Sequence, residues 1–339
     1  MKRQYVFLSF FFVSIIFATL MSGCKDPLGI NSPQSVNSSD TQIFMKITDK
    51  SSSVNSFTPN YTDDQAMAFA GSLAKELYPI RIGQKMKLVD KSLILSKDSA
   101  SALGTLIQNY AGELTIVGSF QKPTLGINAR VDTTIHKTFL TTVTRLIKYN
   151  KVSNTGNDTL DWKIYAISLP NGGTEGDNIQ IVKITFTSQD GSDVVIDDPN
   201  NYFFRVGDEK KESDDEDNHD SEMGFGNWRH GEKNLLTWYK KNQPVKFSVE
   251  VLSKSSDPDL LTITYGAKMN GNSKLKAKFD LVSSVQEGIY YKKIYERKWF
   301  TNSFQARMHA VINAMPRSVA YDTETSVEEK TWGIPYRVK

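Results

Sequence analysis

The chain has 339 residues, and its 41 lysine and arginine residues against 38 aspartate and glutamate residues give a formal net charge of +3. Hydrophobic residues at 39% and charged residues at 23% are typical of a globular protein and not of a disordered one. The small net charge argues against a dedicated nucleic-acid binder. The single cysteine excludes an intrachain disulfide framework and a cysteine-rich zinc site.

The N-terminus carries the most specific pattern in the sequence. Lys2 and Arg3 make a positively charged start, an apolar run follows over residues 5–20, and small residues lead directly to Cys24. A charged start, a short apolar core and small residues at the cleavage position define a secretory signal peptide, here residues 1–23. The apolar run is shorter than the ~20 residues that a membrane-spanning helix needs.

The segment that ends at Cys24 resembles the lipobox of bacterial lipoproteins, with Ser22 and Gly23 before the cysteine and Met21 where the family prefers leucine. In that family the signal is cut before the cysteine, whose sulfur receives diacylglycerol and whose new amino terminus is acylated. The resemblance implies lipidation of Cys24, no other cofactor, and a membrane as partner. Lys25 follows in place of aspartate, which in enteric-type bacteria implies the outer membrane, on either its periplasmic or its cell-surface side.

Residues 24–60 are predicted to form the lipidated cysteine and a flexible tether. Serine, asparagine, threonine, proline and glycine dominate this stretch, apart from a short apolar patch at residues 43–45 that is able to pair with the fold. Such a polar segment buries too little apolar surface to offset the entropy of ordering it.

A helix over residues 63–77 is predicted next. Thr62 and Gln65 have capping-box spacing, and Pro79 is expected to stop the helix. Apolar residues recur at helical spacing at Ala66, Phe69, Ala70, Leu73 and Leu77.

From residue 80 the apolar residues alternate with polar ones, which predicts long antiparallel strands with a hairpin turn near residues 154–158. One helix followed by four or more such strands makes an α+β domain over residues 61–170, with a curved antiparallel sheet. The closing run Trp162–Ser168 resembles the last strand of NTF2-like or cystatin-like domains. The resemblance covers residues 62–169 and implies a cone-shaped sheet, which in those families often holds a small ligand.

Residues 171–339 are predicted to form a β-sandwich, because strands recur about every ten residues with turn residues between them. Residues 175–300 resemble an Ig-like or fibronectin-like sandwich, without the cysteine pair of antibody domains. Residues 304–315 fit both a helix and a strand, and a strand is favoured because the segment follows an all-β region. Residues 332–336 are expected to pack on the sandwich and close it.

Residues 208–222 form an acidic loop in which Asp214, Glu216 and Asn218 are candidate calcium ligands, since calcium prefers oxygen donors. The spacing departs from an EF-hand loop because His219 occupies the glycine position. A solvated acidic loop at one end of the sandwich is the favoured interpretation.

Trp228 and Trp238 are candidate ligand-stacking residues, because aromatic rings stack on sugars and anchor partners. A place in the core is the more common role of such side chains. The sequence contains no nucleophile elbow, phosphate loop or dinucleotide-binding pattern, so no catalytic residue is assigned and no enzyme activity is expected.

These features predict a non-enzymatic cell-envelope lipoprotein that acts as a structural, adhesive or ligand-binding module. Its expected partners are the membrane, through the lipid, and an envelope protein or a glycan. One alternative is an assembly or lipid- and peptide-carrier accessory, which needs an apolar pocket between the helix over residues 63–77 and the sheet. Another is a glycan-active enzyme, which needs two carboxylates in a cleft beside Trp228 or Trp238.

Overall fold

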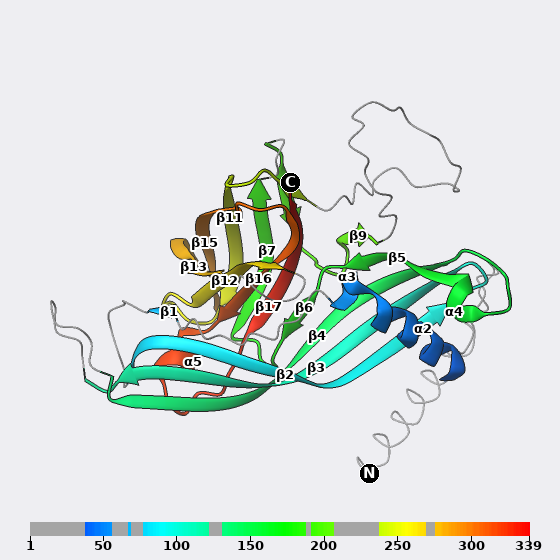
Figure 1. Cartoon of the computed structure of the whole chain (residues 1–339). Helices are drawn as coiled ribbons and strands as arrows, with labels where there is room; N and C mark the ends of the chain where they lie inside the picture. Colours follow the sequence, from blue (N-terminus) through cyan, green and yellow to red (C-terminus); the bar gives the residue numbers. More distant parts are fainter. Residues whose placement is uncertain are drawn as a thin grey trace, which may run out of the picture. The chain divides into compact units, whose positions relative to one another are not determined.

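The computed structural model describes residues 38–55, 67–68, 77–121, 131–187, 191–206, 237–268 and 275–339. They belong to one compact unit, Val36–Lys339, which includes both sides of the domain boundary predicted at residue 170. The described part is mostly β-strand in antiparallel sheets (Figure 1), as the alternating patterns predicted.

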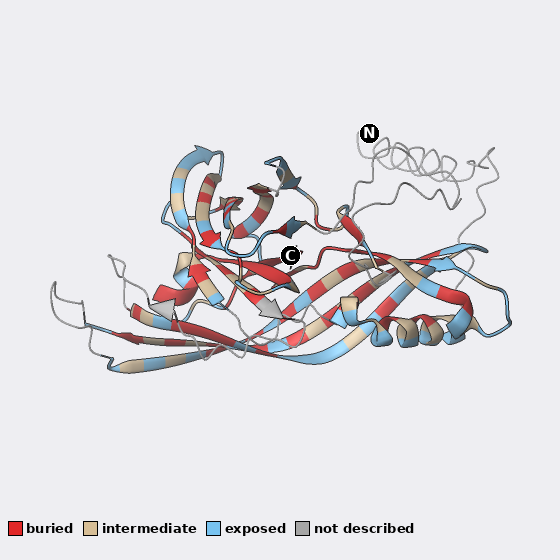
Figure 2. Ribbon diagram, turned by 45° about the horizontal axis from the view of Figure 1, so that its top comes forward, coloured by how far each residue is buried: buried red, intermediate tan, exposed pale blue. Residues whose placement is uncertain are grey.

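Three long strands make up the larger part of the first sheet. They are β2 (Tyr78–Lys97), β3 (Ser101–Ser119) and β4 (Thr133–Lys151), and they pair antiparallel along almost their whole length. In β3 every second residue from Ala102 to Gly118 is buried, so one face packs on the core and the other faces outward (Figure 2). This alternation follows from the two-residue repeat of a strand.

The first sheet continues across the predicted domain boundary. From β4 it runs through the short strand β6 to β17, β16, β12 and β13, so strands from residues 78–151 share one hydrogen-bonded sheet with strands from residues 260–338. Among the described strands all pairs are antiparallel except β10 with β17. The other strands of this sheet are β1 (Met67–Ala68), β5 (Trp162–Ser168), β6 (Asn171–Gly173), β9 (Phe203–Arg205), β10 (Trp238–Tyr239), β12 (Leu260–Lys268), β13 (Leu275–Lys278), β16 (Ala306–Met315) and β17 (Lys330–Val338).

A second sheet has the strand order β14-β15-β11-β7-β8. Its strands are β7 (Ile179–Thr187), β8 (Asp193–Ile196), β11 (Pro244–Ser253), β14 (Asp280–Glu287) and β15 (Tyr290–Phe300). A row of stacked rings joins it to β12 of the first sheet, with centroid separations of 4.9 Å for Phe186–Phe247, 4.6 Å for Phe247–Trp299 and 4.4 Å for Trp299–Tyr265. The two sheets therefore share one aromatic core, and an Ig-like connection of their strands stays a prediction.

A buried ion pair fixes the turn between β11 and β12. Lys293 Nζ lies 2.8 Å from Asp259 Oδ2, and neither side chain is exposed. The same ammonium group donates to the Asp257 carbonyl, and the Ser253 and Tyr295 hydroxyls donate to the Asp259 carboxylate at 3.0 and 3.3 Å. These hydrogen bonds satisfy both buried charges, as a pair without water requires.

The described helices are α2 (Ser38–Lys50), α3 (Ser52–Asn55), α4 (Asp158–Asp161) and α5 (Arg317–Tyr321). The prediction of a flexible tether is therefore wrong for residues 38–55. Phe44 of α2 is fully buried, with its ring 4.8 Å from Tyr149 in an edge contact and 5.1 Å from Trp162. The apolar patch at residues 43–45 thus packs the polar segment around it against the fold, together with the buried Thr48 and Val54.

The helix predicted over residues 63–77 is wrong at Met67–Ala68, which form the short strand β1 on β2. Residues 62–66 and 69–76 lie outside the described residues. Pro79 lies inside β2 instead of ending a helix, close to an irregularity in the β2–β3 register. An edge position tolerates proline because its missing N–H faces away from the ladder.

Residues 306–315 form strand β16, so the preference for a strand over a helix in this segment is confirmed. The aromatic segment 332–336 lies in β17, where Trp332, Ile334 and Tyr336 are buried.

Candidate functional site

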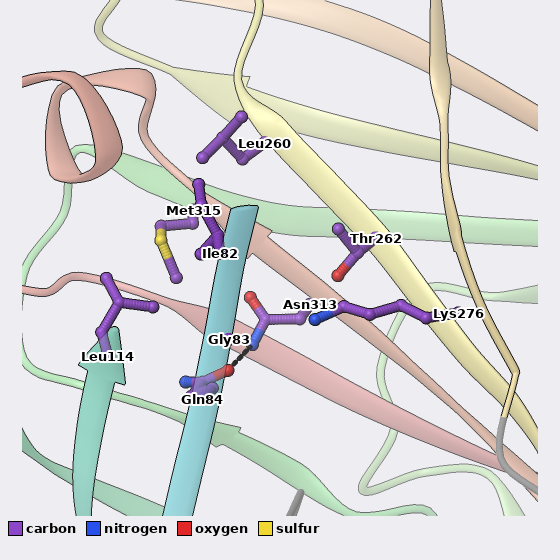
Figure 3. A pocket seen from close by; sticks show the side chains of 9 residues that line it. All are labelled: Ile82, Gly83, Gln84, Leu114, Leu260, Thr262, Lys276, Asn313 and Met315. Atoms are coloured by element: carbon purple, nitrogen blue, oxygen red, sulfur yellow. Dashed lines mark hydrogen bonds between the residues drawn. The ribbon is translucent and has the colours of Figure 1, made fainter. Parts of the chain in front are cut away.

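A small cavity lies where β2 and β3 approach β12, β13 and β16 (Figure 3). Its space for water-sized molecules is about 30 Å³. That volume admits one or two water molecules, whereas small-molecule pockets begin at roughly 300 Å³. The lining residues are Ile82, Gly83, Gln84, Leu114, Leu260, Thr262, Lys276, Asn313 and Met315.

Two amide side chains of this lining hold a buried carboxylate, Glu329, which directly precedes β17. The side-chain amide groups of Gln84 and Asn313 both donate to Glu329 Oε2, the latter at 2.7 Å. The Asn313 amide also lies 3.5 Å from Gln84 Oε1, the contact drawn in Figure 3. Thr174 fixes the Glu329 backbone from the other side, through hydrogen bonds of 3.0 Å to its N–H and its carbonyl. Strands from both ends of the described chain therefore meet at one carboxyl group.

The second oxygen of this carboxyl group, Oε1, is buried and has no hydrogen-bond partner among the described residues. Burial raises the pKa of Glu329 above its usual 4.5, against the opposing effects of the Asn313 and Gln84 amides, of Lys276 and of the Thr141 hydroxyl. Desolvation wins because Glu329 has no exposed surface at all. The carboxyl group is therefore a proton-binding group that sits beside a water-sized cavity.

This arrangement can bind a proton, a water molecule or a small hydrogen-bond donor, and the described residues around it suggest no further chemistry. The cavity lining contains neither a carboxylate nor a nucleophilic cysteine or serine. In the ranges that the structure describes, no cluster of three or more histidine, cysteine, aspartate or glutamate side chains is arranged to hold a metal ion. The carboxyl group of Glu329 hydrogen-bonds to residues of β2 and β16 at the start of β17, and burial raises its pKa.

Replacing Glu329 by glutamine is expected to remove a pH dependence of folding stability. Because the folded-state pKa is raised, the native protein binds more protons than the unfolded chain between pH 4.5 and the folded pKa, so stability falls as pH rises through that window. The glutamine carbonyl still accepts from the two amides, and the uncharged side chain binds no proton on folding. We expect Glu329→Gln to be more stable than the wild type at pH 7 by roughly 1–3 kcal/mol, the cost of a buried unsatisfied group.

Urea unfolding at several values between pH 4 and pH 8 measures this difference. The control is Glu287→Gln on the exposed strand β14, which should leave the pH profile unchanged. A Glu329→Gln profile with the same slope as the wild type would show that this carboxyl group titrates normally.

The sequence-predicted site residues lie elsewhere. Cys24, the candidate calcium ligands Asp214, Glu216 and Asn218, and Trp228 are all outside the described residues. Trp238 lies in β10 beside β17, with 39% of its surface exposed and Lys339 Nζ 5.3 Å from its ring centroid. Trp238 does not line the cavity, so the structure does not bring the stacking candidate and the buried carboxyl group together.

Sequence reasoning did not select Glu329 because it stands in the run Glu328-Glu329-Lys330, which reads as a solvated charged segment. Both glutamates are buried, and Glu328 accepts hydrogen bonds from the backbone N–H groups of Asn178 and Ile179. The one available signal is the position of this run directly before the buried apolar strand β17.

Neither the family models nor the curated proteins with which the sequence was compared contain a match to it. The fold and the cavity therefore define this chain only as a mostly antiparallel β protein with a buried acidic junction. No helix in the described ranges has both the length and the apolar character to cross a membrane.

Proposed function

We propose that this chain is a non-enzymatic lipoprotein of the cell envelope, held in the outer membrane by lipid on Cys24. In this proposal its β-rich body is a structural or adhesive module that works through its surface and not through an internal pocket. The cavity beside Glu329 gives a ligand-binding role no support, because about 30 Å³ is too small for a metabolite.

The observation that carries the proposal is the place where the described fold begins. α2 starts at Ser38, so only residues 25–37 separate it from the lipobox cysteine. A chain segment of that length spans at most ~45 Å. α2 is fixed to the long strands by Phe44 and by the ion pairs Lys97–Asp40 and Lys91–Asp49. A lipid on Cys24 would therefore hold the folded body close to the membrane surface.

The two packed sheets of the C-terminal part support a further element of the proposal, an Ig-like sandwich. Ig-like modules commonly act through their edges and loops. The exposed aliphatic side chains on the outward face of the long strands, such as Leu140, are the described surface best suited to contact a partner. Among the described residues no observation favours the glycan-active enzyme or the carrier.

The lipid anchor is tested by replacing Cys24 with serine in the full-length precursor. Serine offers no thioether linkage, so we expect complete loss of labelled palmitate and accumulation of the uncleaved chain. The wild type should carry the label and sediment with the outer membrane, and the exposed Ser39→Ala substitution in α2 is the matched control. Palmitate label that persists in Cys24→Ser would contradict the proposal.

A further inference from the structure

One end of the three long strands lies where the N-terminal segment enters the fold. This end, the turn end, consists of residues 98–100 between β2 and β3 and residues 152–161 between β4 and β5. The first turn of α2 is fixed there, because Asp40 lies 3.1 Å from Lys97, the last residue of β2. α4, which belongs to the turn end, contacts α2 as well (Figure 1).

The turn end carries exposed aliphatic side chains. Ile94 and Leu103 lie on the face of the sheet opposite to α2, since their neighbours Leu93 and Ala102 belong to the core that contains Phe44. Leu160 in α4 adds a third, with 62% of its surface exposed. Val152 is also exposed, at the start of the second turn. Exposed aliphatic residues that gather at one place on a soluble surface mark an interaction site.

The turn end itself carries three carboxylates, Asp98, Asp158 and Asp161, and exposed lysines flank it on the neighbouring strands. The Asp98 carboxylate accepts hydrogen bonds from the N–H groups of Ala100 and Ser101, and Asp161 is buried among donors from residues 153–156. Lys151 and Lys163, by contrast, are exposed on β4 and β5. Lysines beside exposed aliphatic residues are the combination that binds the bilayer interface, through headgroup charge and burial of apolar surface.

We infer that the turn end rests on the lipid bilayer that holds the Cys24 lipid, with Leu160, Val152 and the Ile94–Leu103 face in contact with the headgroup region. The inference depends on the proposed lipid anchor. It names the bilayer as the occupant because residues 25–37 place the anchor within ~45 Å of this end of the body.

The test uses the full-length lipidated protein in vesicles of phosphatidylethanolamine and phosphatidylglycerol. Cys24 is the only cysteine and is acylated in the proposal, so an introduced cysteine is the only free thiol. Leu160→Cys and, as the matched control, Ile289→Cys are each labelled with an environment-sensitive fluorophore. Ile289 is also an exposed aliphatic residue, at 73%, in the β14–β15 turn of the second sheet.

We expect the label at position 160 to emit at shorter wavelength in vesicles, because the bilayer interface is less polar than water, and to be quenched by lipids that carry a nitroxide at the headgroup. The label at position 289 should keep its emission in both measurements. Flotation with the vesicles shows that the protein is still anchored. In such a sample, quenching at position 289 that equals or exceeds the quenching at position 160 would overturn the inference. Labelling of the wild-type chain itself, together with loss of flotation, would instead show that Cys24 is not acylated and overturn the proposed function as well.

Discussion

Replacing Phe44 by alanine is expected to lower the free energy of unfolding by about 3–5 kcal/mol, the usual cost of removing a buried aromatic ring. The ring is fully buried and contacts Tyr149 and Trp162, with Lys97 Nζ 5.9 Å from its centroid. α2 has thirteen residues, a length at which isolated helices are marginal in water. Phe44 is the fully buried apolar side chain of the helix, and the ion pairs of Asp40 and Asp49 alone are too weak to hold it, so we expect α2 to detach in the variant.

Urea unfolding measures the loss, and the matched control is Gln42→Ala in the exposed face of the same helix. The control should change stability by less than about 0.5 kcal/mol. Circular dichroism of Phe44→Ala should show reduced helix signal before the main transition. A Phe44→Ala protein as stable as the control would mean that α2 is not part of the cooperative unit.

Replacing Lys293 by methionine is also expected to cost about 3–5 kcal/mol, because it leaves the Asp259 carboxylate buried without its cation. Burial already raises the pKa of Asp259, and the two hydroxyl donors that remain stabilise the charge less than the ammonium group does. The double variant Lys293→Met with Asp259→Leu should recover much of the loss, since an apolar pair needs no compensation.

The matched control is Lys292→Met on the neighbouring, outward-facing position of β15. Lys292 pairs with Glu250 at 3.0 Å, but its side chain is 37% exposed, so this change should cost less than about 1 kcal/mol. Equal unfolding free energies for Lys292→Met and Lys293→Met would show that the buried pair contributes no more than a surface one.

The strands could be predicted from the sequence because their signal is local. β11 alternates buried and outward positions over its ten residues, and β7 does so with one interruption at Val182 and Lys183, so their repeat is visible without knowledge of their partners. β16, by contrast, is buried at every position from Met308 to Met315, and its strand was favoured only because the segment follows an all-β region. The pairing of β6 with both β4 and β17 was not predictable in the same way. β6 has only three residues, Asn171–Gly173, in a segment that reads as a turn.

The order of residues 38–55 and the burial of Glu329 depend on contacts between residues far apart in the chain. Phe44 contacts Tyr149 and Trp162, and Glu329 receives hydrogen bonds from Gln84 and Asn313. By composition, residues 38–55 are polar and the run at residues 328–330 is charged, and both descriptions are correct. Tertiary contacts override them, because one ring in an apolar site, or one carboxyl group held by two amides, decides the position of the whole segment.

The continuity of the first sheet has a consequence for how this protein matures. Residues 142–144 of β4 reach the C-terminal strands only through β6, and β17 adds its ladder from residues 330–338. The pairing of β6 with β17 thus closes a loop of more than a hundred residues between residues 171–173 and 330–332, which slows this step of folding and leaves the strand edges exposed meanwhile. The first sheet is complete only when β17, which ends at residue 338, is available to pair. A chain exported through a narrow secretion pore would therefore emerge with β2, β3 and β4 before their C-terminal partners are present. In the proposed envelope location, chaperones that shield strand edges would therefore affect the yield of the folded protein.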